Sequence, residues 1–315
     1  MKQIIQNYRN GNYQVELWDD GTKIRKGDLA GAGPLIPAFP ENCDIKLTNW
    51  CDNPICEKYC HERSNIYGNH GNLLRLIRLL GTAPPGMECA FGGGSTLSHP
   101  DLLEMLRSIQ KELSLVCNVT LNAFHVETQI DLIEQLLQEK LIYGIGISFN
   151  QFAKLDKYAA PFNKLASLTQ NVVYHLIAGI HTIEDAKWLI ENRANPKILV
   201  LGYKQFGNGV NYFNSHKVDL EANLYQWLTR IHTIIGLNGV ILSFDNLAIE
   251  QLKIRRFFND EGWSKFYQGD DGFANLYVDI PNLEYAVSSR SANKHKLKDD
   301  DTFESIFKVV RKEKI

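Results

Sequence analysis

Three cysteines, Cys51, Cys56 and Cys60, lie within ten residues of one another. Thiolates this close in sequence can bind the same metal centre. Three protein ligands leave one position open, because a structural zinc site takes four protein ligands, while a catalytic site keeps one position for water or substrate. An iron–sulfur cluster bound by three cysteines would likewise leave one iron free for a small molecule. The spacing therefore predicts a metal centre with an open coordination position.

A glycine-rich turn is the second feature that could do chemistry. The apolar run at residues 87–91 ends in Gly92, Gly93 and Gly94, and Ser95 follows. Glycines at a strand end let a ligand approach the backbone closely. The exposed amide and carbonyl groups there could bind an amino-acid-like carboxylate and ammonium, or they could simply form a tight turn. Ser95 could bind the same carboxylate or cap the following helix, and these two roles are compatible.

The bulk composition is that of a globular protein. Of the 315 residues, 44% are hydrophobic and 22% are charged, and the net charge of −2 gives no strong signal for nucleic-acid or membrane binding. No apolar run approaches the ~20 residues that span a bilayer, and the N-terminus lacks the apolar segment of a signal peptide. We expect a cytoplasmic protein with reduced thiols, in which clustered cysteines favour metal binding over disulfides.

Strand-like and helical patterns alternate from residue 43 onward. Apolar strand patterns occur at residues 43–49, 87–91, 116–121, 143–149, 171–178, 197–201 and 240–244. Helical patterns occur at residues 72–80, 100–112, 129–138, 152–158, 182–192, 219–235 and 248–255, with Thr182 as a plausible cap. This alternation predicts an α/β fold, a partial (β/α) barrel of about six to seven units, with a doubly wound sheet as the competing topology.

The two ends of the chain are expected to belong to the same domain as the barrel. Residues 1–42 predict a β-hairpin, which turns at Asp20 and Gly21, and a lead-in segment. The barrel itself spans residues 43–250. Residues 251–315 form a predicted cap of two antiparallel strands, 273–280 and 284–288, and a helix at 302–311. Polar residues in this cap, at 277–279 and 288–291, are interpreted as a charged surface turn.

Polar residues that follow the strands are candidates for binding. In a parallel barrel the chemistry gathers at the C-terminal ends of the strands. The candidates are Asn122, Ser148, Asn150, His175, Tyr203, Lys204 and Asp245. We interpret His175 as a core histidine, although an acid–base role stays open. Lys204 could bind an anionic group or be solvated, and Asp245 is expected to cap the next helix.

The cysteine loop and the glycine turn together resemble the radical SAM superfamily. The residues that carry the resemblance are the run DIKLTNWC, Tyr59 before the last cysteine, and the turn GGGST. The resemblance covers roughly residues 43–245. The usual family spacing is Cys-x3-Cys-x2-Cys, whereas this chain has Cys-x4-Cys-x3-Cys, one residue longer in each gap. The loop also leaves His61 beside Cys60 as an alternative ligand.

The resemblance implies both cofactors and their binding residues. Cys51, Cys56 and Cys60 would hold a [4Fe-4S] cluster, and the free iron would bind S-adenosyl-L-methionine. Contacts to S-adenosylmethionine would come from Gly92, Gly93, Gly94 and Ser95 at its methionine end, and from Asn122, Ser148, Asn150, Ile177 and Tyr203 elsewhere. An external flavodoxin- or ferredoxin-like donor would supply the electron that yields a 5′-deoxyadenosyl radical. This radical would abstract hydrogen from a small-molecule or nucleotide-like substrate.

Other interpretations stay open. No cysteine cluster follows Cys117, so an auxiliary-cluster domain is not expected; modification of a peptide is nevertheless an alternative within the superfamily. A zinc-binding protein would use the three cysteines with His61 or Cys43, in a structural rather than catalytic role. A zinc-dependent barrel hydrolase would need ligands at several strand ends, where only His175 is well placed. Cys43, Cys89 and Cys117 are interpreted as core residues.

Overall fold

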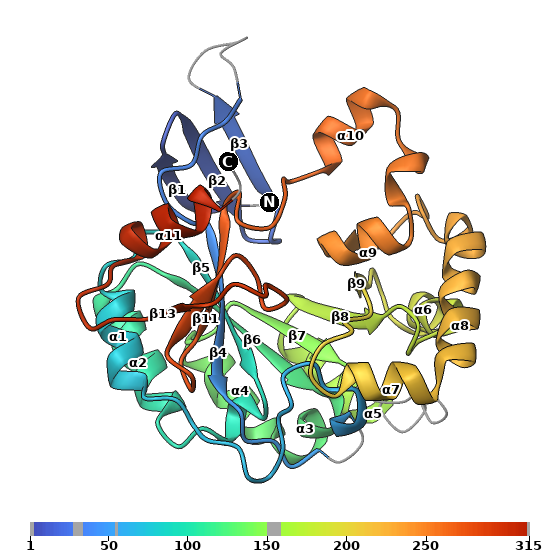
Figure 1. Cartoon of the computed structure of the whole chain (residues 1–315), viewed down its shortest axis with the longest axis horizontal. Helices are drawn as coiled ribbons and strands as arrows, with labels where there is room; N and C mark the ends of the chain where they lie inside the picture. Colours follow the sequence, from blue (N-terminus) through green and yellow to red (C-terminus); the bar gives the residue numbers. More distant parts are fainter. Residues whose placement is uncertain (1–2, 28–33, 54–55, 150–158, 314–315) are drawn as a thin grey trace.

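The chain folds as a large, mostly parallel sheet with a small antiparallel sheet beside it (Figure 1). The computed structural model describes residues 3–27, 34–53, 56–149 and 159–313. Within these residues the large sheet has the order β10-β9-β8-β7-β6-β5-β4-β11-β12-β13, and the small one has the order β1-β2-β3. No helix in this described part is long and apolar enough to cross a membrane.

The parallel strands follow chain order, as the alternating pattern predicted. They are β4 (Asn42–Thr48), β5 (Glu88–Gly93), β6 (Val116–Asn122), β7 (Gly144–Ser148), β8 (Val172–Ile177), β9 (Lys197–Leu201) and β10 (Ile241–Phe244). Burial alternates along β5, β7, β8 and β9; in β8, Val172, Tyr174 and Leu176 are buried while His175 and Ile177 are only half-buried. The buried side chains pack against the helices, so the half-buried ones face the barrel interior.

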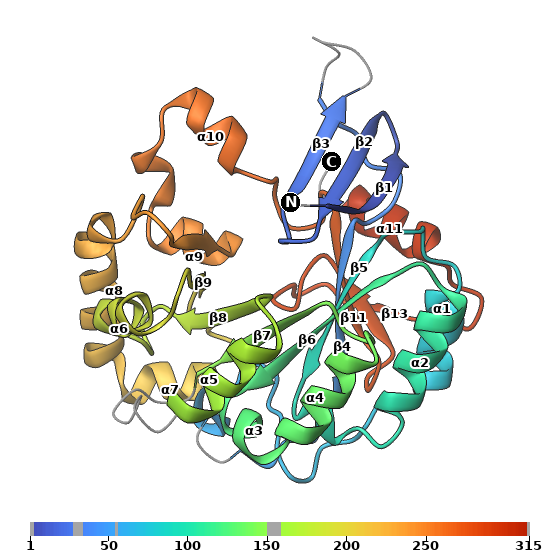
Figure 2. The same cartoon turned by 180° about the vertical axis from the view of Figure 1, so that it is seen from behind.

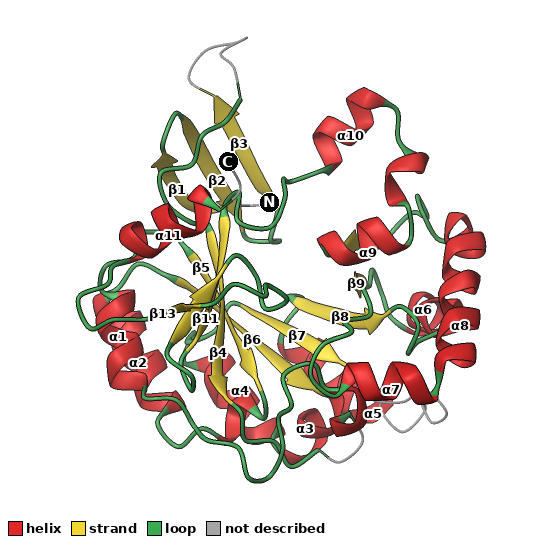
Figure 3. Ribbon diagram, viewed as in Figure 1, coloured by secondary structure: helices red, strands yellow, loops and turns green. Residues whose placement is uncertain are grey.

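Helices cover the outer face of this sheet (Figure 3). They include α1 (Leu73–Leu80), α2 (Leu102–Glu112), α4 (Ile130–Gln138), α5 (Ala159–Leu168), α6 (Ile183–Asn192) and α8 (Lys217–Arg230). In α1, Leu73, Leu76 and Leu80 share the buried face, and the Asn72 side chain caps the helix by accepting from Arg75 N at 3.2 Å. The helix expected at residues 152–158 lies outside the described residues.

Several short helices were not expected from the sequence. These are α3 (Ala123–Thr128), α7 (Gly209–Ser215) and α10 (Asp260–Phe266), whereas α9 (Asn246–Gln251) is the short helix expected near residues 248–255. Six or seven residues make less than two turns, which is too short for a helical periodicity to stand out. Two of them, α3 and α7, prove important for the site.

The C-terminal strands extend the barrel sheet. Strand β11 (Asn275–Asp279) runs antiparallel to β12 (Glu284–Ala286), as expected, but it also pairs in parallel with β4, on the side away from β5. Strand β13 (His295–Lys296) follows, and α11 (Phe303–Lys312) packs Phe303, Ile306 and Val310 into the core. Because Tyr277 and Asp279 are therefore only 4% and 0% exposed, their interpretation as a surface turn was wrong.

The N-terminal sheet lies at the N-terminal ends of the barrel strands (Figure 2). The predicted hairpin is confirmed as β2 (Tyr13–Trp18) and β3 (Lys23–Gly27), and β1 (Ile4–Asn10) adds a third strand. The β2–β3 turn meets the N-terminal ends of β7 to β9. Its contacts are Tyr143 OH to Trp18 O at 3.0 Å, Asn171 Nδ2 to Asp19 O at 3.3 Å and Lys197 Nζ to Asp20 O at 3.0 Å.

A buried carboxylate joins this sheet to the barrel. Glu41, immediately before β4, is 0% exposed. It accepts hydrogen bonds from Arg25 Nε at 2.8 Å and from Tyr13 OH at 2.5 Å, and Lys23 Nζ lies 3.6 Å away. Burial alone would raise the pKa of Glu41, but the Arg25 hydrogen bond and the charges of Lys23 and Arg25 lower it below its ordinary value.

We expect Glu41→Gln to destabilise the fold and to flatten its acid sensitivity. A carboxylate whose pKa is lowered on folding contributes stability above its unfolded pKa, and that contribution disappears as pH falls through the folded pKa. Removing the charge should cost about 3 kcal/mol at neutral pH, because Arg25 loses its buried partner. Urea unfolding from neutral pH to well below the ordinary glutamate pKa of about 4.3 measures both effects. Glu284→Gln, at a pair with the exposed Lys296, is the control, and parallel pH profiles for wild type and Glu41→Gln would contradict the expectation.

Candidate functional site

The three cysteines of the loop after β4 come together at the C-terminal end of the barrel strands. The thiols of Cys51 and Cys56 hydrogen-bond to each other, which lowers the pKa of Cys51 and raises that of Cys56. The charge of Cys60 also raises the pKa of Cys56, and burial raises the pKa of Cys60 itself. Cys51 is buried, whereas Cys56 and Cys60 are half-buried. The Cys51 and Cys56 thiols therefore face each other, and Cys60 lies within electrostatic range of both.

A second loop, between β9 and α7, holds the cysteine loop in place. Asn208 N donates to Cys60 O at 3.0 Å, and Asn208 Nδ2 donates to Glu57 O at 2.8 Å. The preceding Gly207 has a φ of +56°, and a Cβ there would lie 2.3 Å from the carbonyl oxygen of His61. A side chain at position 207 would thus push the two loops apart.

Asn122 contacts one of the cysteines. It ends β6 and caps α3, since its Oδ1 accepts from Phe124 N at 2.9 Å. Its Nδ2 lies 3.9 Å from Cys56 Sγ, within hydrogen-bond distance for sulfur. The sequence predicted that Asn122 would bind the cofactor, and the structure places it against a cysteine that would ligate the cluster. A donor to a thiolate sulfur is a group that tunes an iron–sulfur centre.

The glycine turn packs directly on the start of the cysteine loop. Gly94 N donates to Thr48 O and Ser95 N donates to Trp50 O, both at 2.8 Å. A Cβ at Gly94 would lie 2.0 Å from the carbonyl oxygen of Trp50, so the turn needs glycine for this close approach. Gly92, in contrast, faces open space, because a Cβ there would meet only the Thr120 side chain at 3.7 Å. Of the predicted turn residues, Gly92 leaves the most room for a ligand.

His125 connects the glycine turn to the cysteine loop. Its Nε2 lies 2.9 Å from Asp52 Oδ1 and 3.3 Å from Ser95 Oγ, and Ser95 Oγ lies 2.7 Å from Ser98 Oγ. Ser95 is 0% exposed, so a cofactor carboxylate would have to displace one of these contacts to reach its hydroxyl. His125 lies on α3, and nothing in the sequence spacing pointed to it.

The remaining predicted residues line the barrel interior or its rim. Ser148 is level with Asn122 on one side and with His175 on the other. Ile177 and Tyr203 border a cavity of about 40 Å³ next to Tyr59 and His61, and Tyr203 OH donates to Gly209 O at 2.7 Å. Asn150 lies outside the described residues.

His175 faces the barrel interior and was interpreted as a core residue. A Cβ at Gly146 would lie 2.5 Å from its Cε1, so a glycine on β7 makes room for the ring. Burial and the nearby charge of Lys204 lower the pKa of His175 to about 4. The imidazole is therefore neutral at physiological pH.

A buried lysine anchors the far end of the cysteine loop. Lys46, on the inner face of β4, lies 2.6 Å from Glu62 Oε2 and 3.3 Å from Asp279 Oδ2. Its side chain is 4% exposed and that of Asp279 is 0% exposed. Tyr277 OH lies 3.3 Å from both Glu62 oxygens, and Glu62 Oε1 lies 3.3 Å from His61 Nε2. This network could not be predicted from the sequence, because it depends on the pairing of β4 with β11.

The zinc alternative lacks a fourth ligand among the described residues. His61 Nε2 lies 3.3 Å from both Glu62 and Lys204 Nζ, away from the thiols. Cys43 is the second residue of β4, is 0% exposed and packs in the hydrophobic core, so it lies at the opposite end of the strand from the loop. Within the described residues, no three side chains from His, Cys, Asp and Glu are placed to bind a single metal ion.

Comparison with solved structures identifies the fold. No protein-family model and no curated protein matches the sequence. Streptococcus suis SuiB bound to its precursor peptide SuiA has a TM-score of 0.60 at 12% identity, over 86% of this chain and 65% of SuiB. SuiB bound to S-adenosylmethionine has a TM-score of 0.55 at 13% identity, over 86% of this chain and 64% of SuiB. The chain thus spans slightly less than two thirds of SuiB, and it shares with SuiB the α/β fold of a partial β/α barrel that the sequence predicted.

We expect Lys46→Met to destabilise the protein by about 3 kcal/mol, because it leaves two carboxylates buried without their cation. Urea unfolding measures the loss. The control is Lys265→Met, which breaks an ion pair of 2.6 Å with Glu261 at a fully solvated helix surface and should change stability little. Equal effects of the two substitutions would contradict a structural role for the buried network.

Proposed function

We propose that the chain is a radical SAM enzyme that acts in the cytoplasm. The observation that carries the proposal is the group of three thiols at the C-terminal end of β4, with an Nδ2–H donor from Asn122 beside one of them. The proposal is also supported by the fold that the chain shares with SuiB, whose structure has been solved with S-adenosylmethionine bound. When bound, a [4Fe-4S] cluster would supply the electron that cleaves S-adenosylmethionine and starts hydrogen abstraction.

The chain's own residues would position and shield these cofactors. Cys51, Cys56 and Cys60 are the sulfur ligands, and Asn122 would stabilise the added negative charge of the reduced state through its contact with Cys56. The open space beside Gly92 would take the methionine end of S-adenosylmethionine. Ser148 and Ile177 face the interior further along the sheet, where ribose and adenine would bind. An external flavodoxin- or ferredoxin-like donor would deliver the electron.

The substrate class separates two versions of this proposal. We favour a small molecule, because the charged cavity beside the barrel has a volume of about 310 Å³, which suits a compact ligand. The second version is modification of a peptide, which is supported by the structure of SuiB with its precursor peptide SuiA. Because the chain spans slightly less than two thirds of SuiB, the peptide version rests on the fold alone.

Replacing Cys56 with Ala should abolish both the cluster and the cleavage of S-adenosylmethionine, because two thiolates cannot hold a cubane that needs three. The measurements are visible absorption after anaerobic reconstitution and mass spectrometry of 5′-deoxyadenosine after reduction. Cys117→Ala, at a core cysteine of β6, should keep both signals. A wild-type protein that stays colourless and binds one zinc would contradict the proposed function.

Asn122→Ser should make the cluster harder to reduce. A serine hydroxyl can still cap α3 but is too short to reach Cys56 Sγ, so the reduced cluster loses a hydrogen-bond donor. Its reduction potential, measured by titration with electron paramagnetic resonance, should become more negative than in the wild type. Asn118→Ser, at the same face of β6 but away from the cysteines, is the matched control. An unchanged potential in Asn122→Ser would show that the amide does not act on the cluster.

A further inference from the structure

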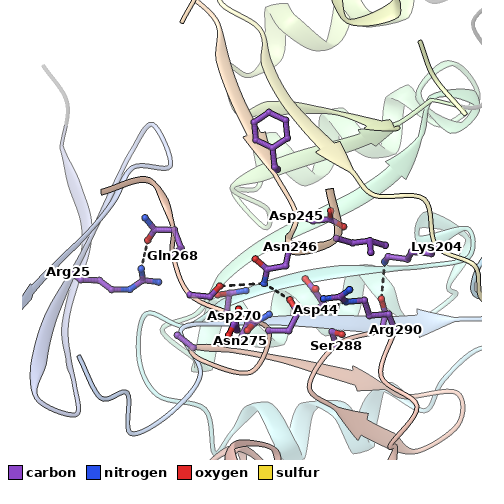
Figure 4. A pocket seen from close by; sticks show the side chains of 17 residues that line it. Arg25, Asp44, Lys204, Asp245, Asn246, Gln268, Asp270, Asn275, Ser288 and Arg290 are labelled. Carbon is purple, nitrogen blue, oxygen red and sulfur yellow. Dashed lines mark hydrogen bonds and ion pairs between the residues drawn. The ribbon is translucent and has the colours of Figure 1, made fainter. Parts of the chain in front are cut away.

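A charged cavity opens where the barrel sheet fails to close on itself. It has a volume of about 310 Å³ and lies between the ends of β9 and β10 on one side and β4, β11 and the loop after β12 on the other. Figure 4 shows side chains from both sides gathered around it, among them Asp44, Asp245, Lys204 and Arg290. Asp44 and Asn42 belong to the inner face of β4, which also carries Lys46.

Most charges in this cavity already have partners within the chain. Arg25 is paired with the buried Glu41. Asp271 accepts from Asn246 Nδ2 at 2.6 Å and from Arg290 Nε at 3.0 Å. Asp270 accepts from Tyr267 OH.

Asp245 caps α9, as the sequence predicted. Its Oδ1 accepts from Ala248 N at 2.7 Å and from Gly202 N at 2.9 Å. This carboxylate is therefore committed to two backbone amides, and it contributes negative charge to the cavity wall without offering a free site to a ligand.

Two side chains of opposite charge in the cavity, Asp44 and Lys204, have no ion-pair partner among the described residues. Within the described residues, the Asp44 carboxylate has no hydrogen bond or ion pair, although it lies in the electrostatic range of Lys204. Lys204 Nζ contacts Ser289 Oγ at 3.0 Å and His61 Nε2 at 3.3 Å, and no carboxylate of the described residues lies within 4.0 Å of it. Burial and the carboxylates of Asp271 and Asp245 raise the pKa of Asp44, while Lys204 lowers it. A bound cation would relieve this repulsion.

We propose that the cavity binds a zwitterionic, amino-acid-sized ligand, with its ammonium at Asp44 and its carboxylate at Lys204 and Ser289. A ligand with both charges pairs with both groups at once, whereas a ligand with one charge would leave the other group without a partner. The volume of about 310 Å³ suits a molecule of this size.

The cavity is connected to the cysteine loop through Lys204. The same lysine borders the cavity on one side and contacts His61, the neighbour of Cys60, on the other. The ligand would therefore lie beside the proposed radical centre, as a substrate must. Its identification as the substrate rests on the proposed function, but its binding to the cavity can be measured without turnover.

The test is isothermal titration calorimetry on the full chain with its reconstituted cluster. The probes are glycine, β-alanine and γ-aminobutyrate, which separate the two charges by increasing distances, together with n-butylammonium and butyrate as singly charged analogues. We expect at least one zwitterion to bind about tenfold tighter than either analogue. Equal affinity of zwitterions and singly charged probes, or no binding by any zwitterion, would overturn the proposal.

Matched variants locate the two charges. Asp44→Asn should reduce the affinity of the preferred zwitterion to that of butyrate, and Lys204→Met should reduce it to that of n-butylammonium, while Asp44→Glu should retain most of the affinity. Asp270→Asn removes a negative charge from the same cavity wall but should leave the affinity unchanged, because Asp270 already has a partner. Equal losses in Asp270→Asn and Asp44→Asn would overturn the assignment to Asp44.

The outcome is independent of S-adenosylmethionine cleavage. If the wild type binds a zwitterion as expected but yields no 5′-deoxyadenosine, the site stands and the proposed function fails. If the wild type cleaves S-adenosylmethionine but binds every probe equally, the site fails and the proposed function stands. A peptide substrate would be indicated by acetylated and amidated tripeptides that bind more tightly than the free zwitterions, which would also overturn the proposal.

Discussion

The burial of Lys46 is the constraint on which the arrangement of the site depends. An ammonium group that is 4% exposed needs partners, because the uncompensated charge would cost several kilocalories per mole in this environment. The partners come from two places that are far apart in sequence: Glu62, just after the last loop cysteine, and Asp279, on β11. The cysteine loop can satisfy Lys46 only in one position over the barrel, and β11 can do so only when it pairs beside β4.

The same pairing creates the opening beside the barrel. Because β11 extends the sheet from β4 and continues into β12 and β13, the edge of β4 does not meet β10 to close the barrel. The gap is lined by polar side chains of both edges. A polar lining is stable there because most of its charges pair with one another, as in Asp271 with Arg290. Asp44 and Lys204 are the exceptions, and they face the same cavity.

Sequence patterns predicted what depends on local periodicity. Apolar runs such as residues 197–201 coincide with β9, and Thr302 and Asn72 cap the helices that were expected after them. The network around Lys46 and the contacts of His125 could not be predicted, because each depends on which strands or short helices become neighbours. Residues 277–279 show the limit of prediction from local sequence patterns. The polar Tyr277 and Asp279 have the residue types of a surface turn, but the pairing of β11 with β4 buries them.

Contacts with neighbouring elements also explain how the longer spacing between the cysteines is accommodated. The extra residue in each gap lengthens the loop, and a longer loop loses more conformational entropy when it is ordered. Each gap has an anchor that offsets this cost. In the first gap Asp52 is bound by His125 of α3 at 2.9 Å; in the second, Glu57 O is bound by Asn208 at 2.8 Å and Tyr59 packs edge-on against Tyr212 of α7. The two short helices that the sequence did not reveal are thus elements that hold this unusual loop at the end of the barrel strands.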